Sequence, residues 1–247
     1  MSMWFLVALA LLLAGPLLTL AFGRASVGGD WRTASQRAAG LAPDPAEHRE
    51  PVVQVYASRA FGWRGAFSDH TWVAVKPEGA ARYTRYEVIG WYASGGRPVI
   101  SISSQRAPDA EWYGAPPRLL RDLRGPEAAA VIERLPQAIA AYPWPTEYRV
   151  WPGPNSNTFV AHLGRAIPEL RLAMPSTAVG KDYVSLREIV GPSPSHTGVA
   201  VSLYGLVGVT AAWDEGLEVN VLGLVAGVDV RRPALKLPGI GRVPGDG

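Results

Sequence analysis

The sequence predicts an α+β fold: an N-terminal transmembrane helix, followed by one domain with a mainly antiparallel sheet and a few helices. Three observations carry this prediction. Residues 3–22 contain no charged side chain. Several short segments rich in β-branched and aromatic residues are separated by turns, in a chain with 27 glycines and 22 prolines among 247 residues. The hydrophobic fraction of 48% and the charged fraction of 18% are typical of a folded domain.

The composition excludes several classes of site. The chain has no cysteine, which rules out disulfides, thiolate metal ligands and a cysteine nucleophile. The net charge is only +3 and no basic run occurs, so we expect no nucleic-acid partner. His48, His162 and His196 lack metal-ligand spacing with His70, and no glycine-rich phosphate loop is present. We therefore expect neither a metal site nor a cofactor.

Residues 1–23 are predicted to be a membrane anchor. As a helix, the twenty residues Met3 to Phe22 reach about 30 Å, the thickness of a bilayer's hydrocarbon core. A cleaved signal peptide is the alternative, with Ala21-Phe22-Gly23 as a cleavage site. The missing basic residue before the apolar run, and the length of that run, favour an uncleaved anchor. The lipid bilayer is the partner expected for Met3 to Phe22.

Residues 24–51 read as a linker, and residues 52–230 as the α+β domain. Val52–Ala57, Thr71–Lys76 and Tyr83–Trp91 are predicted strands of an antiparallel meander. Further along, we expect a short helix over 116–123, a helix over 126–139 kinked or broken at Pro136, a strand over 148–151 and a helix over 158–167.

The C-terminal part contains an internal repeat. Residues 201–207 match residues 219–225 at an offset of 18, with Asp214-Glu215-Gly216 between them. This arrangement predicts two strands that pair around that turn. Residues 231–247 are rich in proline and glycine and are expected to be an irregular tail.

Two residues stand where chemistry is possible. His70 begins a predicted strand, and a rigid strand could hold it in place as a general base. A histidine that only forms a structural hydrogen bond at a strand end is the commoner case. Ser156 follows Pro152-Gly153-Pro154 at the start of a predicted helix, where the helix dipole and free N–H groups favour a nucleophile. Serine is also a preferred N-cap residue, so a purely structural role stays open.

Several long motifs resemble the bacterial family known as domain of unknown function 3750. They are VVQVYASRAFGWRGAFSDHTWVAVKP, YTRYEVIGW, YRVWPGPNSNTFVAHL, GKDY, GLEVNVLGL and RPALKLPGIGR, and the resemblance extends from Trp31 to Arg242. It implies no established activity. For a bacterial chain, the predicted anchor over Met3 to Phe22 leads us to expect a location in the inner membrane, with a single pass. Arg24, Arg32 and Arg37 after the span favour a cytoplasmic domain. N-terminal anchors, however, often export the domain behind them, so the side stays open, with a slight preference for the periplasm.

A second motif is similar to the circularly permuted papain-like fold of cell-wall peptidases and lecithin:retinol acyltransferases. There, a strand-borne histidine precedes an Asn-Cys-x-x-Phe motif at a helix start. Here His70 and the segment Asn-Ser-Asn-Thr-Phe match those places, with Ser156 in place of the cysteine. Because a hydroxyl is a weaker nucleophile than a thiolate, the resemblance implies either a serine variant or a site without catalysis.

Other residues complete the expected site. Glu87, on the strand after His70, is the candidate to orient the histidine, although pairing with a surface arginine explains it equally well. Asn155 and Asn157 are expected to offer amide groups to a substrate, and Trp151 and Trp72 an aromatic surface. The sequence therefore supports two functions: a membrane-anchored serine hydrolase or acyltransferase acting on an envelope or lipid amide or ester, or a non-catalytic binding protein.

Overall fold

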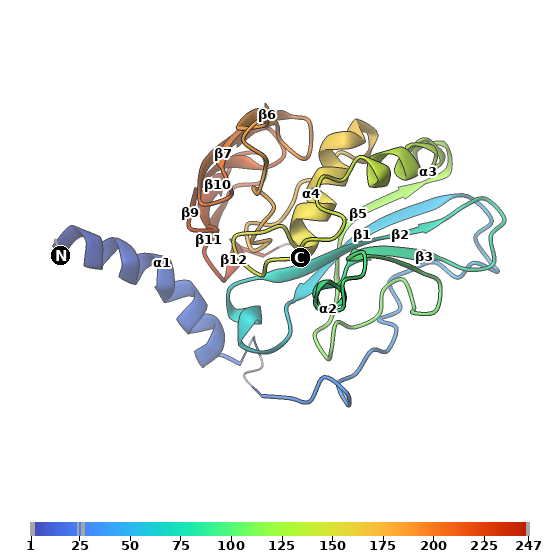
Figure 1. The fold of residues 1–247 in the computed structure, drawn as a ribbon, viewed down its shortest axis with the longest axis horizontal. Coiled ribbons are helices and arrows are strands. Elements are labelled where there is room, and N and C mark those ends of the chain that lie inside the picture. The colour runs from blue at the N-terminus through green and yellow to red at the C-terminus, as the bar shows by residue number, and fades with distance from the viewer. Residues whose placement is uncertain (1–2, 24, 26–27, 246–247) are drawn as a thin grey trace.

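The computed structural model describes residues 3–23, 25 and 28–245. It has the predicted α+β architecture, with two antiparallel sheets (Figure 1). The described residues form four α-helices: α1 (Met3–Ala21), α2 (Gly90–Ser94), α3 (Gly125–Ala140) and α4 (Ser156–Ala166). Two short 3₁₀ helices accompany them, η1 (Gly62–Ala66) and η2 (Pro168–Leu170).

The smaller sheet has five strands in the order β4-β3-β2-β1-β5. Its strands are β1 (Val52–Arg59), β2 (Asp69–Lys76), β3 (Thr84–Val88), β4 (Ile100–Ser103) and β5 (Arg118–Arg124). The first three confirm the predicted meander. The helix expected over 116–123 is wrong, because this segment instead pairs along β1 as strand β5.

Both faces of the smaller sheet are covered. Val53 and Val55 point toward α3 and α4 and lie in the main apolar core. Tyr56 and Trp72 point the other way and stack on each other at 5.5 Å between ring centroids. α3 runs unbroken through Pro136, so the predicted kink or break does not end the helix. The strand expected over 148–151 is also absent from this described segment, which is irregular.

The larger sheet has seven strands in the order β12-β11-β10-β9-β8-β7-β6. Its strands are β6 (Val190–Pro192), β7 (Gly198–Leu203), β8 (Val207–Ala212), β9 (Gly216–Val221), β10 (Leu224–Asp229), β11 (Ala234–Leu237) and β12 (Gly241–Val243). The predicted turn at Asp214 joins β8 to β9, but each half of the repeat is itself a hairpin, so four strands form where two were expected. The segment expected to be irregular, 231–247, contains β11 and β12.

The two repeat hairpins turn at equivalent residues. Tyr204-Gly205 and Leu222-Gly223 all have positive φ, between 52° and 81°. The first loop spans three residues, because Leu203 pairs with Val207, and the second spans two, because Val221 pairs with Leu224. The same sequence motif therefore enters β8 and β10 in different registers.

A charged layer lies beneath the larger sheet. Lys181 Nζ is 2.6 Å from Glu218 Oε2 and 3.2 Å from Asp182 Oδ1, and Lys236 Nζ is 2.6 Å from Glu218 Oε1. Asn220 donates to Asp182 Oδ2 at 2.9 Å. All five side chains are buried, so the inward face of this sheet is polar.

Helix α1 leaves the body at one corner of the larger sheet (Figure 1). Thr19 donates to the carbonyl of Gly239 at 3.1 Å, and a Cβ on Gly15 would overlap the carbonyl oxygen of Pro238. Across the described part of the chain, no helix combines the length and the apolar character needed to cross a membrane. The predicted transmembrane helix over Met3 to Phe22 is therefore not supported. Arg24 of the expected flanking charge lies outside the described residues.

Candidate active site

A cavity of about 720 Å³ opens where the start of β2, the end of β3, η1 and the N-terminus of α4 meet. Several aromatic side chains contribute to its wall, and His70 and Ser156 are both among the lining residues. The lining residues are Trp31, Ala60, Phe61, Arg64, Ser68, Asp69, His70, Val88, Ile89, Gly90, Trp91, Ser94, Trp112, Tyr113, Tyr148, Val150, Asn155, Ser156 and Asn157.

The His70 ring is held from two sides. Its Nε2 lies 3.0 Å from Glu87 Oε2, and its plane stacks on Trp112 with ring centroids 3.5 Å apart. Arg85 Nη2 donates to the same Glu87 oxygen at 2.8 Å and lies over the Trp72 ring. The alternation of β3 puts Arg85 and Glu87 on the face that carries His70. The structure thus brings Glu87 to His70, as the sequence predicts, although its catalytic role stays a prediction.

Burial and charge set the protonation of this pair. Burial lowers the pKa of His70, and the hydrogen bond with Glu87 opposes this shift without reversing it. Burial alone would raise the pKa of Glu87, but the hydrogen bond from His70 and the charge of Arg85 lower it to about 2. An ionised Glu87 only accepts hydrogen bonds, so the proton of a neutral His70 is on Nε2. Nδ1 is then the basic nitrogen.

Ser156 is the first residue of α4, and Asn155 is its N-cap. The Asn155 side chain accepts from the N–H of Asn157 at 2.9 Å and of Thr158 at 3.2 Å, which completes a capping box. The reading of Ser156 as the cap is therefore wrong. Among the described residues, the Ser156 hydroxyl and its backbone N–H make no hydrogen bond. Ser156 itself is 4% exposed and lines the cavity.

The segment around Thr71 joins the two halves of the site. The Thr71 hydroxyl donates to Asn157 Oδ1 at 3.0 Å and lies 3.4 Å from the carbonyl oxygen of Ser156. The N-terminus of α4 is thus held against the residue that follows His70. Within the described contacts, however, the Ser156 hydroxyl does not hydrogen-bond the His70 ring. The two share the cavity without a direct bond.

The expected substrate-binding residues have other roles in this structure. The Asn155 amide donates to Val150 and Val179 carbonyls, and the Asn157 amide to Asp69 and Val179 carbonyls. These bonds fix the loop around α4, although both residues line the cavity.

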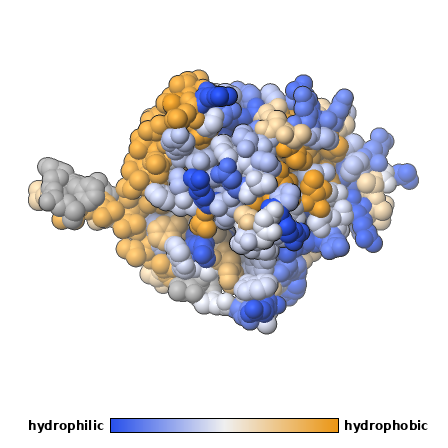
Figure 2. Space-filling model, viewed as in Figure 1, coloured by the Kyte–Doolittle hydropathy of each residue, from blue (hydrophilic) through white to orange (hydrophobic). Residues whose placement is uncertain are grey.

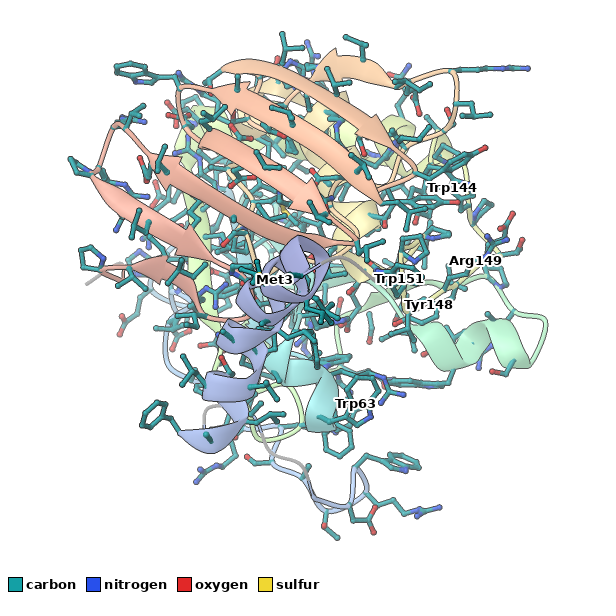
Figure 3. All side chains as sticks on the ribbon, turned by 90° about the vertical axis from the view of Figure 1, so that its left-hand side faces the viewer. Met3, Trp63, Trp144, Tyr148, Arg149 and Trp151 are labelled. Carbon is teal, nitrogen blue, oxygen red and sulfur yellow. The ribbon has the colours of Figure 1, made fainter. Side chains whose placement is uncertain are left out.

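The two tryptophans lie away from the cavity wall. Trp72 is fully buried, and its indole N–H donates to Pro108 at 2.7 Å. Trp151 is half exposed beside the larger sheet, where it donates to Leu222 at 2.8 Å (Figure 3). Neither is placed to bind a substrate in this cavity. A strand pattern gives the face of Trp72 but not its depth, which explains the difference.

Sequence reasoning missed the group that stacks on His70. Trp112 lies in an irregular segment, which has no periodicity to show its direction. It also missed Asp69, which is buried beside His70 and is 2.5 Å from Arg118 Nη2. Adjacency of Asp69 to His70 was the only available signal. Among the described residues, no group of three or more potential ligands is placed to hold a metal ion.

Comparison with known protein families identifies the family of the chain. The family described as "Protein of unknown function (DUF3750)" matches residues 50–183, which is more than half of the 247 residues. The chain belongs to this family. The match includes His70, Glu87 and Ser156, and it ends before the larger sheet begins. No curated protein and no solved structure matches the chain.

Proposed function

We propose that the protein is a serine hydrolase or acyltransferase that cleaves an ester or amide. The observation that carries this proposal is the shared cavity. Ser156, at the N-terminus of α4, and the buried His70, which is held by the Glu87 carboxylate, both line this cavity. The similarity of this pairing to the permuted papain-like fold supports the proposal.

In the proposed reaction, Ser156 is the nucleophile. As its oxygen attacks the carbonyl carbon of the substrate, its proton passes to Nδ1 of His70, and the carbonyl becomes an oxyanion. The Ser156 N–H and the positive end of α4 stabilise that oxyanion. The proton on His70 then passes to the leaving alcohol or amine as its bond to carbon breaks. Water, or an acceptor alcohol or amine, releases the acyl group by the reverse sequence.

Glu87 and Trp112 are proposed to position the base. Glu87 holds Nε2 and stabilises the imidazolium that forms during the attack. Trp112 limits rotation of the ring by stacking on it. The low pKa of Glu87 keeps the carboxylate ionised, and the lowered pKa of His70 keeps the ring neutral and able to accept a proton.

The walls of the cavity favour an apolar acyl group. Phe61, Trp91, Tyr113 and Tyr148 contribute aromatic surface, and Arg64 contributes a positive charge at the exposed side. We therefore propose an envelope or lipid ester or amide as the substrate class. The proposed location is the bacterial inner membrane, with the exposed apolar side chains of α1 as the contact with lipid.

Labelling with a serine-reactive fluorophosphonate tests the reaction. The native chain should be labelled, Ser156→Ala should not be, and His70→Ala should be labelled far more slowly. Ser94→Ala is the matched control, because Ser94 lines the same cavity on its exposed side. Labelling that survives in Ser156→Ala contradicts the proposal.

One observation favours a second candidate, a non-catalytic binding protein. The Ser156 hydroxyl and the His70 ring are not hydrogen-bonded to each other within the described contacts. Absence of labelling in the native chain, together with quenching of tryptophan fluorescence by a bound fatty-acid amide, would favour the binding protein.

A further inference from the structure

In the larger sheet, polar side chains lie on the buried face and apolar side chains on the exposed face, the reverse of an ordinary antiparallel sheet. Its inward positions carry Ser202, Thr210, Glu218, Asn220 and Lys236, all buried. Its outward positions carry exposed aliphatic side chains, including Val199, Val201, Val209, Leu217, Val219 and Leu235. A sheet with one solvated face normally shows the opposite pattern.

The outward face is continuous across the strands. Val201 pairs with Val209, which pairs with Val219, and the next strands bring Val228 against both Leu217 and Leu235. Figure 2 shows hydrophobic residues covering this side of the molecule and extending to the base of α1. None of the described outward positions on β7, β8 and β9 carries a charge. A contiguous apolar surface of this kind marks an interaction site.

Helix α1 identifies the kind of partner. It is fixed to the β11–β12 turn through Gly15 and Thr19, and from there it projects past the side toward which the sheet faces (Figures 1 and 3). Met3, Leu6 and Val7 on its free end are exposed. A flat protein partner would have to accommodate this projecting apolar helix. A bilayer accepts both, because the helix can enter the acyl region while the sheet rests at its boundary.

Aromatic and charged residues lie at the edges of the outward face, as they do at the headgroup level of membrane-contacting surfaces. Trp213 is 62% exposed in the β8–β9 turn, and Trp151 lies beside the β9–β10 turn at the opposite strand ends. Tryptophan is enriched at the level of lipid headgroups. Arg231 forms an ion pair with Asp214, next to Trp213. This charged pair lies at one end of the strands, with Asp214 in the β8–β9 turn.

We propose that the outward face of the larger sheet lies against a lipid bilayer and forms, together with α1, a membrane-contacting surface. The sheet is then a second contact in addition to the helix. The buried charged layer behind it fits this arrangement, because Lys181, Lys236, Glu218 and Asp182 satisfy one another inside the protein and leave the outward face free of charge. The proposal rests on the membrane location proposed above but does not depend on the reaction at Ser156.

Site-specific fluorescence tests the proposal, and the cysteine-free chain makes this simple. Val201→Cys and Leu217→Cys report on the face, and Ile102→Cys is the matched control, an exposed apolar strand residue on the smaller sheet. Each full-length variant is labelled with an environment-sensitive dye and reconstituted into phosphatidylcholine vesicles. Near-ultraviolet circular dichroism checks that each variant keeps its fold.

The expected result is a blue-shifted emission at positions 201 and 217, with severalfold stronger quenching by a lipid-borne nitroxide than by iodide. Position 102 should show the reverse. Iodide quenching at 201 and 217 equal to that at 102 would overturn the proposal. Protection from both quenchers, together with cross-linked dimers, would also overturn it, because the occupant would then be a second copy of the chain.

Discussion

The two sheets of this protein use the same alternation of residues in opposite ways. In the smaller sheet, Val53 and Val55 point into the core with α3 and α4, and the other face is buried by aromatic residues. In the larger sheet, Val201, Val209 and Val219 point outward, and Glu218 and Lys236 point inward. The difference shows that alternation defines two faces of a strand but does not reveal which one is buried. That choice depends on the partner of each face.

The largest effect should come from the charged layer beneath the larger sheet. Replacing Lys181 by methionine leaves the buried carboxylates of Asp182 and Glu218 short of a partner, and should cost about 3–5 kcal/mol of folding stability. Urea unfolding in detergent measures this. Arg134→Met, which removes the exposed ion pair with Glu169, should cost no more than about 1 kcal/mol. Equal losses would show that burial adds nothing to the layer.

The polar pair on the smaller sheet should give the next effect, and it depends on pH. The pKa of Glu87 is about 2 in the folded chain against a usual 4.5, so the ionised carboxylate stabilises the fold above about pH 4.5. This contribution disappears as the pH falls toward 2. Glu87→Gln should therefore cost roughly 3 kcal/mol at pH 7 and flatten the stability profile between pH 4.5 and 2. The exposed Glu147→Gln should leave that profile unchanged.

A matched pair of valines compares the sheets directly. Val55→Ala in the smaller sheet empties a fully buried position, and should cost about 1.5–3 kcal/mol. Val209→Ala in the larger sheet removes a side chain that is 45% exposed, and should change stability by less than about 0.5 kcal/mol in detergent. Chemical denaturation of both variants decides this. A large loss in Val209→Ala would mean that the outward face is covered by protein.

The smallest effects should occur where α4 begins. Asn155→Ala removes the cap and should cost about 1–2 kcal/mol. Ser156→Ala should change the free energy of unfolding by no more than about 0.5 kcal/mol, since its hydroxyl makes no hydrogen bond within the described structure. Thermal melts of the two variants measure the contrast. The reverse order would return the capping role to Ser156.

The sequence predicted the parts of the fold that depend on local pattern. Strands β1, β2 and β3 and the helix after Ser156 lie where alternation, periodicity and the Pro152-Gly153-Pro154 break indicated. The segment over 118–124 could not be recognised as a strand, because its charged residues suit a helix surface and only pairing with β1 makes it extended. The prolines and glycines of 231–247 likewise hid two short strands.

For the candidate site, the sequence predicted the positions of the polar residues better than it predicted their surroundings. His70 and Ser156 line one cavity, and Glu87 contacts His70 from the neighbouring strand. Trp72 was expected at the site but lies two residues deeper along the same face, in the core. Trp112 belongs to a loop, and only the tertiary structure brings its ring onto His70.

The turns of the two repeated hairpins contain residues in an unfavourable backbone conformation. Tyr204 and Leu222 adopt left-handed backbone angles, with φ of 52° and 55°, where asparagine or aspartate would be preferred. Both place a large apolar side chain at an exposed strand end. The positive φ angles of Tyr204 and Leu222 therefore reduce local stability at two turns that border the proposed membrane-contacting surface. Such losses of stability are tolerated where a residue serves function. If the larger sheet contacts a bilayer as proposed, these two apolar side chains lie at the edge of that contact.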